Sequence, residues 1–373
     1  MHILNSRHLL FVLTSCIALA SGISATPAIA AGKPIRVAFG STPSAMTLSA
    51  VYGPITYGTQ YGLTVTKDNY TVFSSGALSV QAVLAGEADV DFVSFMSLLL
   101  LRQSGQDFKL FCPTNAQIDH VLVGRNGVTT VAQLNDPKTR VAISAPSNSA
   151  TTLINAMLIT GSAGFTVKDF TNTKLIDNVD TRQTAWVANE VDVATMRLSQ
   201  FRQSQKDVPD GVIILKSYEV LPVYIFAALI APTAWLYQNR DTAAGLCAAN
   251  LKAIVEMTKS FDAYDTAVKA VIDKPPADDI LKESYDLITQ YGFWAPSKTM
   301  NSDAVNFMSK IAITSGIMKQ APDPNDVLDM KTYNMALGLL SDDDRSALVK
   351  MAVTGTAAAP LGATPSAVAT IAP

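Results

Sequence analysis

The segment Phe73-Ser-Ser-Gly-Ala-Leu-Ser-Val-Gln-Ala-Val-Leu-Ala-Gly-Glu-Ala-Asp-Val-Asp-Phe-Val-Ser94 joins a polar turn, an amphipathic helix and a short apolar strand. Apolar residues recur with helical spacing between Ala77 and Leu84, and Gly86 is suited to the end of a helix. The residues from Asp89 onward favour extended structure. This order predicts one unit of a sheet that is covered by helices.

The polar turn, Ser74-Ser75-Gly76, directly precedes the helix. A serine hydroxyl at this position accepts a hydrogen bond from a free backbone N–H group, and a glycine lets a ligand approach the main chain. The N-terminus of a helix also attracts anions. The turn therefore has two interpretations, a simple helix cap and an anion-binding site, and the residue types alone favour the cap.

The chain has 373 residues, a length that is typical of about two domains. Hydrophobic residues make up 49% of it, which is enough for a large core. The formal net charge is −3, and no basic stripe is present. We therefore expect no nucleic-acid partner.

Residues 1–30 have the features of a signal peptide. The apolar segment from Leu9 to Ala20 is too short to span a bilayer, and Ala28-Ile-Ala30 suits a signal peptidase. This predicts a periplasmic protein. Lipidation at Cys16, within Leu13-Thr-Ser-Cys16, is the less favoured alternative because the apolar segment continues beyond it.

Apolar segments at 34–39, 63–73, 92–95 and 108–112 alternate with helical patterns, which predicts a parallel sheet with helices on both faces. Ligands of such sheets bind at the carboxyl ends of the strands. The loops that contain Ser41, Ser74 and Ser94 are all expected at that edge.

A second set of strands is expected between residues 120 and 215. There, Val187-Ala-Asn-Glu-Val-Asp-Val193 resembles Val83-Leu-Ala-Gly-Glu-Ala-Asp-Val90, and both place Glu-x-Asp-Val between a helix and a strand. We therefore predict two related α/β lobes. The segment 221–230 is expected to return to the first lobe as a strand, and mainly helices follow.

The predicted organisation has five parts: a signal peptide (1–30), the first part of lobe I (31–119), lobe II (120–218), the return to lobe I with the C-terminal helices (219–351), and a tail (352–373). The tail contains mainly Ala, Thr, Pro and Gly, with no charge from Thr354 onward. This composition predicts disorder.

Catalytic and metal-binding sets are missing from the sequence. His120 is the one histidine that would remain after cleavage, and no spacing indicates a catalytic triad, a metal site or a phosphate loop. We therefore predict no cofactor and no metal, and interpret His120 as structural. Glu87, Asp89 and Asp91 are interpreted as a solvated turn.

Cys112 and Cys247 would also remain after cleavage. Their sequence positions leave two alternatives, a disulfide or two buried free thiols.

The pattern Ser-Ser-Gly…Leu-Ala-Gly-Glu-Ala-Asp-Val resembles the periplasmic substrate-binding proteins of nitrate-, sulfonate- and taurine-type ABC importers, over residues 33 to 320. The resemblance implies the two-lobed periplasmic binding protein fold, in which two Rossmann-like lobes joined by two hinge strands close on a ligand. The motif of the thiamine-precursor branch is absent, and the chain is longer than is typical at its C-terminus.

The resemblance also implies ligand contacts from specific loops of both lobes. Carried over to this sequence, the expected contacts are Ser41, Thr42, Pro43, Met46, Ser74, Ser75, Gly76, Ser94, Phe95, Ser147, Asn148, Ser149 and Arg197. Arg197 is expected either to pair with an acidic group of the ligand or to form a surface salt bridge. An aromatic ligand is also compatible with the sequence, since it could stack against the ring of Phe95, Trp186 or Trp294.

The function implied is a monomeric receptor that captures a small organic anion, a sulfonate, carboxylate or related acid, and delivers it to an ABC permease in the inner membrane. Two alternatives remain. One is an enzyme on the same fold, similar to some menaquinone-pathway enzymes, and the other is a sensor-type binding protein.

Overall fold

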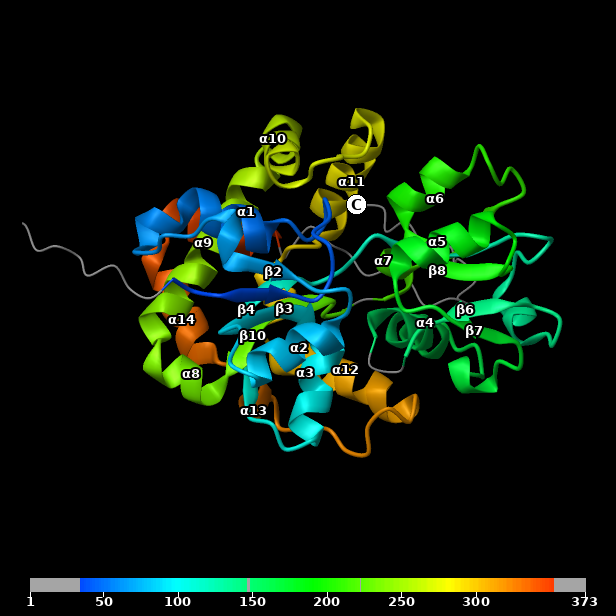
Figure 1. The fold of residues 1–373 in the computed structure, drawn as a ribbon, viewed down its shortest axis with the longest axis horizontal. Helices are drawn as coiled ribbons and strands as arrows, with labels where there is room; N and C mark the ends of the chain where they lie inside the picture. Colours follow the sequence, from blue (N-terminus) through cyan, green and yellow to red (C-terminus); the bar gives the residue numbers. More distant parts are fainter. Residues whose placement is uncertain (1–33, 146–147, 222, 352–373) are drawn as a thin grey trace, which may run out of the picture. The chain divides into compact units, whose positions relative to one another are not determined.

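The computed structural model describes residues 34–145, 148–221 and 223–351. They contain two five-stranded mixed sheets surrounded by helices (Figure 1). The strand order is β2-β1-β3-β10-β4 in the first sheet and β7-β6-β8-β5-β9 in the second. The predicted α/β class with two sheets is confirmed.

In the first sheet, β1 runs parallel to β2 and β3, as predicted, whereas β10 is antiparallel to β3 and β4. The segment 221–230 was expected to return to this sheet as a strand, and the structure adds that the strand is antiparallel. This strand begins at Ala227, opposite Ser94 at the carboxyl end of β3, because the chain enters there on its return from the second sheet. The strands are β1 (Val37–Phe39), β2 (Tyr70–Val72), β3 (Val90–Ser94), β4 (Phe108–Asn115) and β10 (Ala227–Pro232).

Most helices belong to the same part of the chain as the first sheet. They are α1 (Ser49–Tyr57), α2 (Gly76–Leu84), α3 (Phe95–Gln103), α8 (Thr233–Gln238), α9 (Arg240–Thr258), α10 (Phe261–Val271), α11 (Asp278–Tyr291), α12 (Ser302–Thr314), α13 (Pro324–Val327), α14 (Met330–Leu339) and α15 (Asp342–Met351), with the 3₁₀ turns η1 (Gly58–Tyr61), η2 (Lys67–Asn69) and η5 (Pro296–Lys298). The part of the chain that follows β10 is helical, as expected from the sequence.

Helix α9 is the main packing element beside the first sheet. It is buried along most of its length and contacts α1, α10, α14 and β4. A Cβ atom at Gly53 of α1 would lie 2.5 Å from the carbonyl oxygen of Ala249, so only glycine allows this approach. Cys247 of α9 forms a disulfide with Cys112 of β4, which decides between the two alternatives for these residues.

Pro54 lies inside α1, where it cannot donate a hydrogen bond to the carbonyl group of Ala50. The hydroxyl group of Tyr70, at the start of β2, donates to that carbonyl at 2.9 Å instead. The helix therefore continues through Pro54, because a side chain from the neighbouring strand satisfies the carbonyl group that the proline leaves free.

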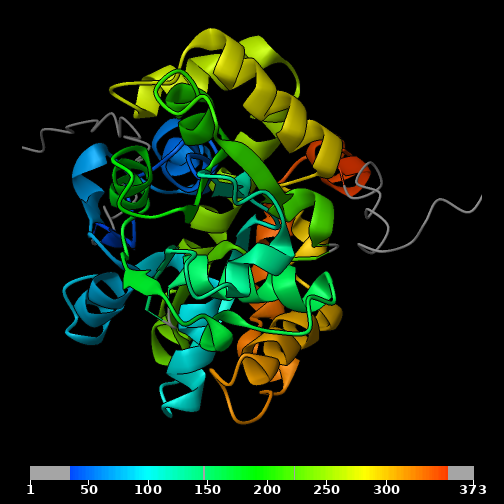
Figure 2. The ribbon, with the colours of Figure 1, turned by 90° about the vertical axis from the view of Figure 1, so that its right-hand side faces the viewer.

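The second sheet has the same arrangement, and its strand β5 is antiparallel to β8 and β9. Figure 2 shows this part in green, facing the viewer. Its strands are β5 (His120–Gly124), β6 (Val141–Ile143), β7 (Thr173–Leu175), β8 (Val193–Arg197) and β9 (Val212–Lys216); its helices are α4 (Ser149–Thr160), α5 (Val179–Val187), α6 (Leu198–Ser204) and α7 (Ser217–Val220), with η3 (Val131–Asn135) and η4 (Val167–Asp169).

The repeat that was found in the sequence corresponds to α2–β3 and α5–β8. Both helices have nine residues, with Ser75 and Asn178 as their N-caps. Both are followed by a residue in the left-handed region, Gly86 with φ of 73° and Asn189 with φ of 60°. Glycine and asparagine adopt this conformation most readily, so different residues satisfy the same requirement.

An arginine–aspartate ion pair stands at the start of the central strands in both sheets. Asp89 accepts hydrogen bonds from the backbone and guanidinium groups of Arg36, and Asp192 does the same with Arg140. Burial acts to raise the pKa of Asp192, but the hydrogen bonds from Arg140 outweigh it and lower the pKa to about 2. The aspartate of each Glu-x-Asp motif is therefore structural.

The predicted signal peptide, the alternative lipidation site at Cys16 and the predicted disordered tail lie outside the described residues. Within the described ranges, no helix has the length and apolar character needed to cross a membrane. The boundaries of the two lobes stay a prediction.

The contact between Tyr70 and Ala50 can be tested by substitution. Tyr70→Phe should lower the free energy of unfolding by about 1–3 kcal/mol, since the carbonyl group of Ala50 loses its partner. Urea denaturation measures this loss. Tyr237→Phe is the matched control, because Tyr237 is 72% exposed and its change should have almost no effect. Equal effects of both substitutions would contradict this role of Tyr70.

The disulfide should contribute substantially to stability because it joins residues 135 positions apart. The double variant Cys112→Ala/Cys247→Ala is expected to lose about 2–5 kcal/mol. Urea unfolding with and without dithiothreitol measures the contribution. The reductant should destabilise the unsubstituted protein and leave the double variant unchanged. A reductant effect of the same size on both proteins would argue against the bond.

Candidate functional site

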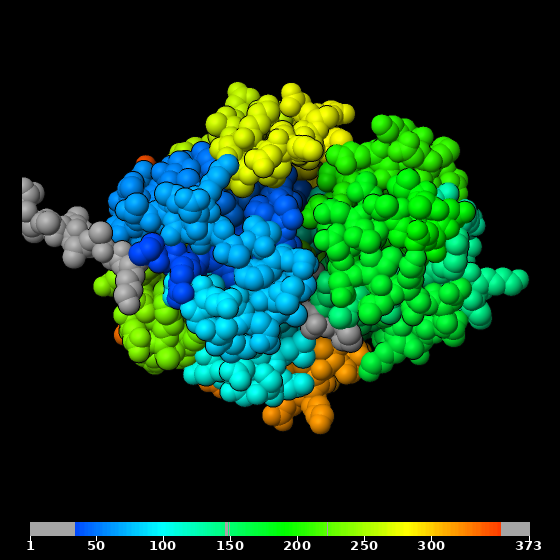
Figure 3. Space-filling model, in the orientation of Figure 1, coloured from blue at the N-terminus to red at the C-terminus, as the bar shows by residue number. Residues whose placement is uncertain are grey.

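A cavity of ≈ 190 Å³ lies between residues of the first and second sheets. The first contributes the loop after β1, the turn before α2 and the end of β3; the second contributes β5 and the starts of α4, α5 and α6. Figure 3 shows the blue and cyan surface of residues from the first group next to the green surface of the second. The carboxyl ends of the parallel strands thus face one cavity, as expected for this type of sheet.

Several of the residues expected as ligand contacts line this cavity. The first-sheet residues among them come from three separate loops, which the structure brings together. The lining includes Ser41, Thr42, Ser74, Ser75, Gly76, Ser94, Asn148 and Arg197.

Other expected contacts lie elsewhere. Met46 and Phe95 are buried in the core, with exposures of 2% and 0%. Met46 lies in the turn before α1, and Phe95 is the first residue of α3. Pro43 is not among the residues that line the cavity. Ser149 begins α4, with a side chain outside the described part, and Ser147 lies outside the described residues altogether.

The aromatic residues at the cavity also differ from those expected. Trp186 and Trp294 are buried in the core, where their indole N–H groups donate to the carbonyl groups of Asp192 and Met46. The rings that line the cavity belong to Phe73, Phe92 and Phe226. The cavity therefore has an apolar wall from the first sheet and its return strand.

Several helices begin at the cavity. Ser75, Ser94 and Asn178 are N-caps, and each accepts a backbone N–H hydrogen bond from its own helix, at distances from 2.9 to 3.4 Å. A serine cap was expected in the turn Ser74-Ser75-Gly76, and the structure shows that Ser75 is the residue that caps α2. The N-termini of α2, α3 and α5 carry partial positive charge, so together they favour an anion in the cavity.

Arg182 of α5 is the main charged residue that the sequence analysis missed. It is 2% exposed and donates to three backbone carbonyl groups, those of Thr195, Ile176 and Asp177. Among the described residues no carboxylate lies within 4.0 Å of it. Burial lowers its pKa to about 10, with a smaller effect of Arg197 in the same direction. Asp177 and Asp180, which also line the cavity, favour its charged form through space. Arg182 is therefore a cation at neutral pH that forms no ion pair with a described residue.

The helical spacing of the sequence contains a signal that could have identified Arg182 as a buried arginine. Arg182 and Trp186 are four residues apart, so they share one face of α5. An arginine on a face that buries a tryptophan has a special role, either structural or functional.

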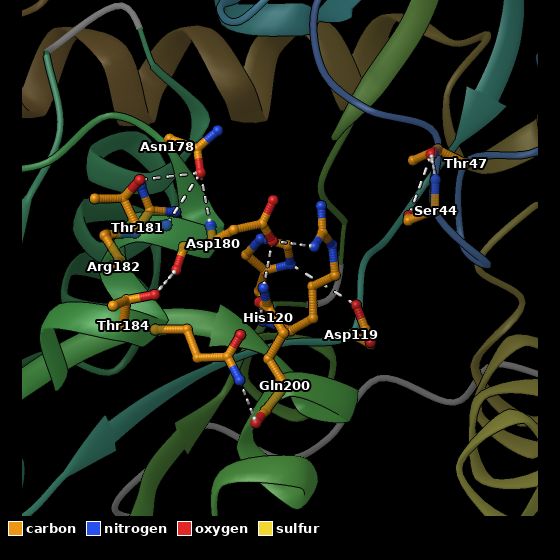
Figure 4. Close-up of polar contacts among 12 residues, drawn as sticks. Ser44, Thr47, Asp119, His120, Asn178, Asp180, Thr181, Arg182, Thr184 and Gln200 are labelled. Carbon is orange, nitrogen blue, oxygen red and sulfur yellow. Dashed lines mark hydrogen bonds and ion pairs between the residues drawn. The ribbon is translucent and has the colours of Figure 1, made fainter. Parts of the chain in front are cut away.

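Arg197, the N-cap of α6, forms a salt bridge, which is one of the two roles expected for it, and pairing with a ligand stays a prediction. Its guanidinium group forms an ion pair with Asp180 at 3.0 Å, and it also lines the cavity. Asp180 is 59% exposed at its side chain and accepts a further hydrogen bond from Gln200. Figure 4 shows Asp180 near Gln200 and the N-cap residue Asn178.

His120 also lines the cavity, so its interpretation as a purely structural residue does not account for its position. Its Nδ1 atom lies 3.8 Å from Oδ1 of the buried Asp119, which is too long for a hydrogen bond. Figure 4 shows this pair. Burial lowers the pKa of His120, and Asp119 opposes the shift.

Asp91 corrects the interpretation of the acidic cluster as a solvated turn. It is 0% exposed in β3, and it accepts a hydrogen bond from the hydroxyl group of Ser79 in α2. Burial raises its pKa to about 8, and the hydrogen bond from Ser79 reduces the shift. Asp91 is therefore mostly protonated at neutral pH, and lies directly below the first turn of α2.

The raised pKa of Asp91 predicts a pH dependence of stability. The folded protein keeps this proton up to about pH 8, whereas an unfolded aspartate releases it near pH 4. The contribution of Asp91 to the free energy of unfolding is thus fully present below about pH 4 and is lost as the pH rises to about 8. Relative to the unsubstituted protein, Asp91→Asn should gain about 2–4 kcal/mol between pH 5 and pH 8, measured by urea unfolding. A constant difference would contradict the buried proton.

Comparison with solved structures supports the fold independently. The ligand-binding component of an ABC-type import system from Staphylococcus aureus matches with a TM-score of 0.64 and 14% identity, over 81% of this chain and 98% of that chain. A putative periplasmic sulfonate-binding protein from Methylobacillus flagellatus KT matches with a TM-score of 0.61 and 16% identity, over 82% of this chain and 94% of that chain. The periplasmic nitrate-binding protein from Synechocystis PCC 6803 matches with a TM-score of 0.61 and 13% identity, over 83% of this chain and 90% of that chain.

No protein-family model matches the sequence, and no curated protein matches it. The identities of 13–16% show the fold alone. This chain accordingly has the fold of the periplasmic solute-binding proteins of ABC importers, and those proteins are its structural neighbours.

Proposed function

We propose that this protein is the extracytoplasmic solute-binding receptor of an ABC importer and captures a small organic anion in the cavity between its two sheets. The fold and its neighbours support the receptor class. The anionic character of the ligand rests on the cavity itself, and one observation carries it: the buried cation of Arg182 has no carboxylate partner among the described residues.

A buried guanidinium group without a counter-ion is unfavourable, because burial removes the water that would otherwise solvate its charge. Three carbonyl groups offset part of this cost for Arg182. A ligand with a carboxylate or sulfonate group would supply the missing negative charge, and planar guanidinium groups bind such groups in a bidentate manner. Arg197 and the N-termini of α2, α3 and α5 add positive potential on the same cavity.

The remaining cavity wall supports an organic anion. Phe73, Phe92 and Phe226 would pack against a hydrocarbon part of the ligand, while Ser41, Thr42 and Ser94 offer hydroxyl groups. A volume of ≈ 190 Å³ suits a small molecule. Sulfonates and carboxylates share this combination of an anionic head and an apolar body.

The partner in this proposal is a membrane permease that recognises the ligand-bound receptor. Ligand binding would favour a closed arrangement of the two lobes, because contacts from both lobes are satisfied only when they close on the ligand. We propose the monomer as the working form and the periplasm as its location.

A thermal-shift panel tests the proposal with ethanesulfonate, nitrate, acetate and benzoate. An anion at 100 times its Kd should stabilise the folded protein by about 2.7 kcal/mol, which corresponds to a rise in Tm of roughly 4 °C. Neutral ethanol and toluene serve as controls for the apolar part. If none of the four anions raises Tm, the proposal of an anion receptor is wrong.

Variants connect the shift to the site. Arg182→Met should remove the shift or reduce the affinity at least tenfold, since the anion would lose its buried counter-charge. Arg202→Gln is the matched control, because Arg202 pairs with Glu283 and is not among the residues that line the cavity. Chromatography of the bound anion distinguishes receptor from enzyme: a receptor returns it unchanged.

A further inference from the structure

We propose that His120 binds the anionic group of the ligand through Nε2 and takes up one proton from solvent as the ligand binds. This inference rests on the proposed function of the cavity and adds a specific residue and a pH dependence to it. Uptake converts a neutral imidazole into an imidazolium ion, with one N–H group for Asp119 and one for the ligand.

The imidazole ring of His120 is buried on one edge and faces the cavity with the other. The side chain of His120 is 7% exposed, and what remains accessible faces the cavity. Nδ1 is fully enclosed and has no hydrogen-bond partner among the described residues. The accessible edge of the ring is therefore the one that includes Nε2. Within the described part of the chain, no side chain or carbonyl group forms a hydrogen bond with Nε2.

Asp119 provides the second half of the arrangement. It is 2% exposed, and its Oδ1 atom is likewise enclosed without a hydrogen-bond partner. Two unsatisfied buried atoms, Oδ1 of Asp119 and Nδ1 of His120, thus lie 3.8 Å apart. Buried polar atoms are rarely left unpaired, and such exceptions occur at functional sites. A small shift of the ring would form the hydrogen bond and orient Nε2 toward the ligand.

The surroundings of His120 explain why the proton arrives only with the ligand. Burial disfavours the charged imidazole most, and Arg197, opposite His120 on β8, and Arg182 on α5 add a smaller effect in the same direction. Asp119 alone favours the charged form. The return strand presents the uncharged ring of Phe226, whose centroid lies 5.7 Å from that of His120. A bound anion would offset the two arginines and raise the pKa of His120.

The sign of the pH effect follows from linkage. If the pKa of His120 is higher in the bound state, the bound protein holds more protons and affinity increases as the pH falls. Each unit of difference changes Kd by about tenfold. Affinity should therefore be lost as the pH rises through the pKa of the bound state.

The experiment measures proton uptake directly in the full chain. Ethanesulfonate, nitrate, acetate and benzoate remain ionised between pH 6 and pH 8, so an absorbed proton must come to rest on the protein. A pH-stat titration at pH 6.5 should record up to one proton taken up per anion bound. Sulfonate buffers are avoided because they would occupy the proposed site. Calorimetry at pH 6 and pH 8 should give a Kd about tenfold larger at pH 8.

Substitutions assign the proton. His120→Gln keeps a hydrogen-bond donor that cannot titrate, so the variant should bind with a pH-independent Kd and without uptake. His2→Gln/His8→Gln, which removes the other two histidines of the chain, should behave like the unsubstituted protein. Asp91→Asn tests the other buried proton-binding group and should retain the uptake. Urea unfolding of each variant confirms that it is folded.

The imidazole resonances provide an independent readout. The full chain has three histidines, and the signals of His120 are those missing from the His120→Gln spectrum. They should titrate at higher pH with the anion than without it. Anion binding without proton uptake, or uptake that persists in His120→Gln, would overturn this proposal and leave the receptor function standing. Failure of all four anions to bind would overturn both.

Discussion

The structure depends on a paired arginine and aspartate that occur once in each sheet. Arg36 and Asp89 stand at the starts of β1 and β3, and Arg140 and Asp192 stand at the starts of β6 and β8. Each aspartate holds both the backbone and the guanidinium group of its arginine, so it fixes the register of two parallel strands at their beginning. Because both strands start level, they also end close together. The loops and helix N-termini that follow them therefore meet at one cavity.

This shared framework makes the differences between the two halves informative. The fourth residue of the helix is Ser79 in α2 and Arg182 in α5, and the strand that follows ends in Ser94 or Arg197. Asp91, the buried second residue of β3, is replaced by Ala194 at the equivalent position of β8. The first half thus holds a protonated carboxyl group under a serine hydroxyl, whereas the second half holds two arginines. The arginines and aspartates that line the cavity, Arg182, Arg197, Asp177 and Asp180, all belong to the second half, whereas the first half contributes hydroxyl groups, aromatic rings and the N-termini of α2 and α3.

The sequence was sufficient for the framework because the framework depends on local patterns. The Glu-x-Asp repeat, the cap at Ser75 and the left-handed position at Gly86 are all visible in short segments. The antiparallel direction of β10 was not visible, since it depends on where the chain returns from the second sheet. The positions of Arg182 and His120 at the cavity were not visible for a related reason: they depend on contacts with residues that are far away in the sequence or in the opposite half. Burial and the absence of a partner are properties of the folded chain.

The site combines two buried groups whose charge requirements are opposite. Arg182 carries a charge with no carboxylate at ion-pair distance among the described residues, whereas the pKa of His120 is lowered by burial and, to a smaller extent, by Arg197 and Arg182. A single anion would improve both situations, since it pairs with the guanidinium group and makes an imidazolium ion favourable at the same time. Such a cavity would bind a negative group more tightly than either residue alone, because each interaction strengthens the other. Without a ligand, Nδ1 of His120 and Oδ1 of Asp119 are buried without hydrogen-bond partners among the described residues, and this cost is the reason why we propose the cavity as a binding site.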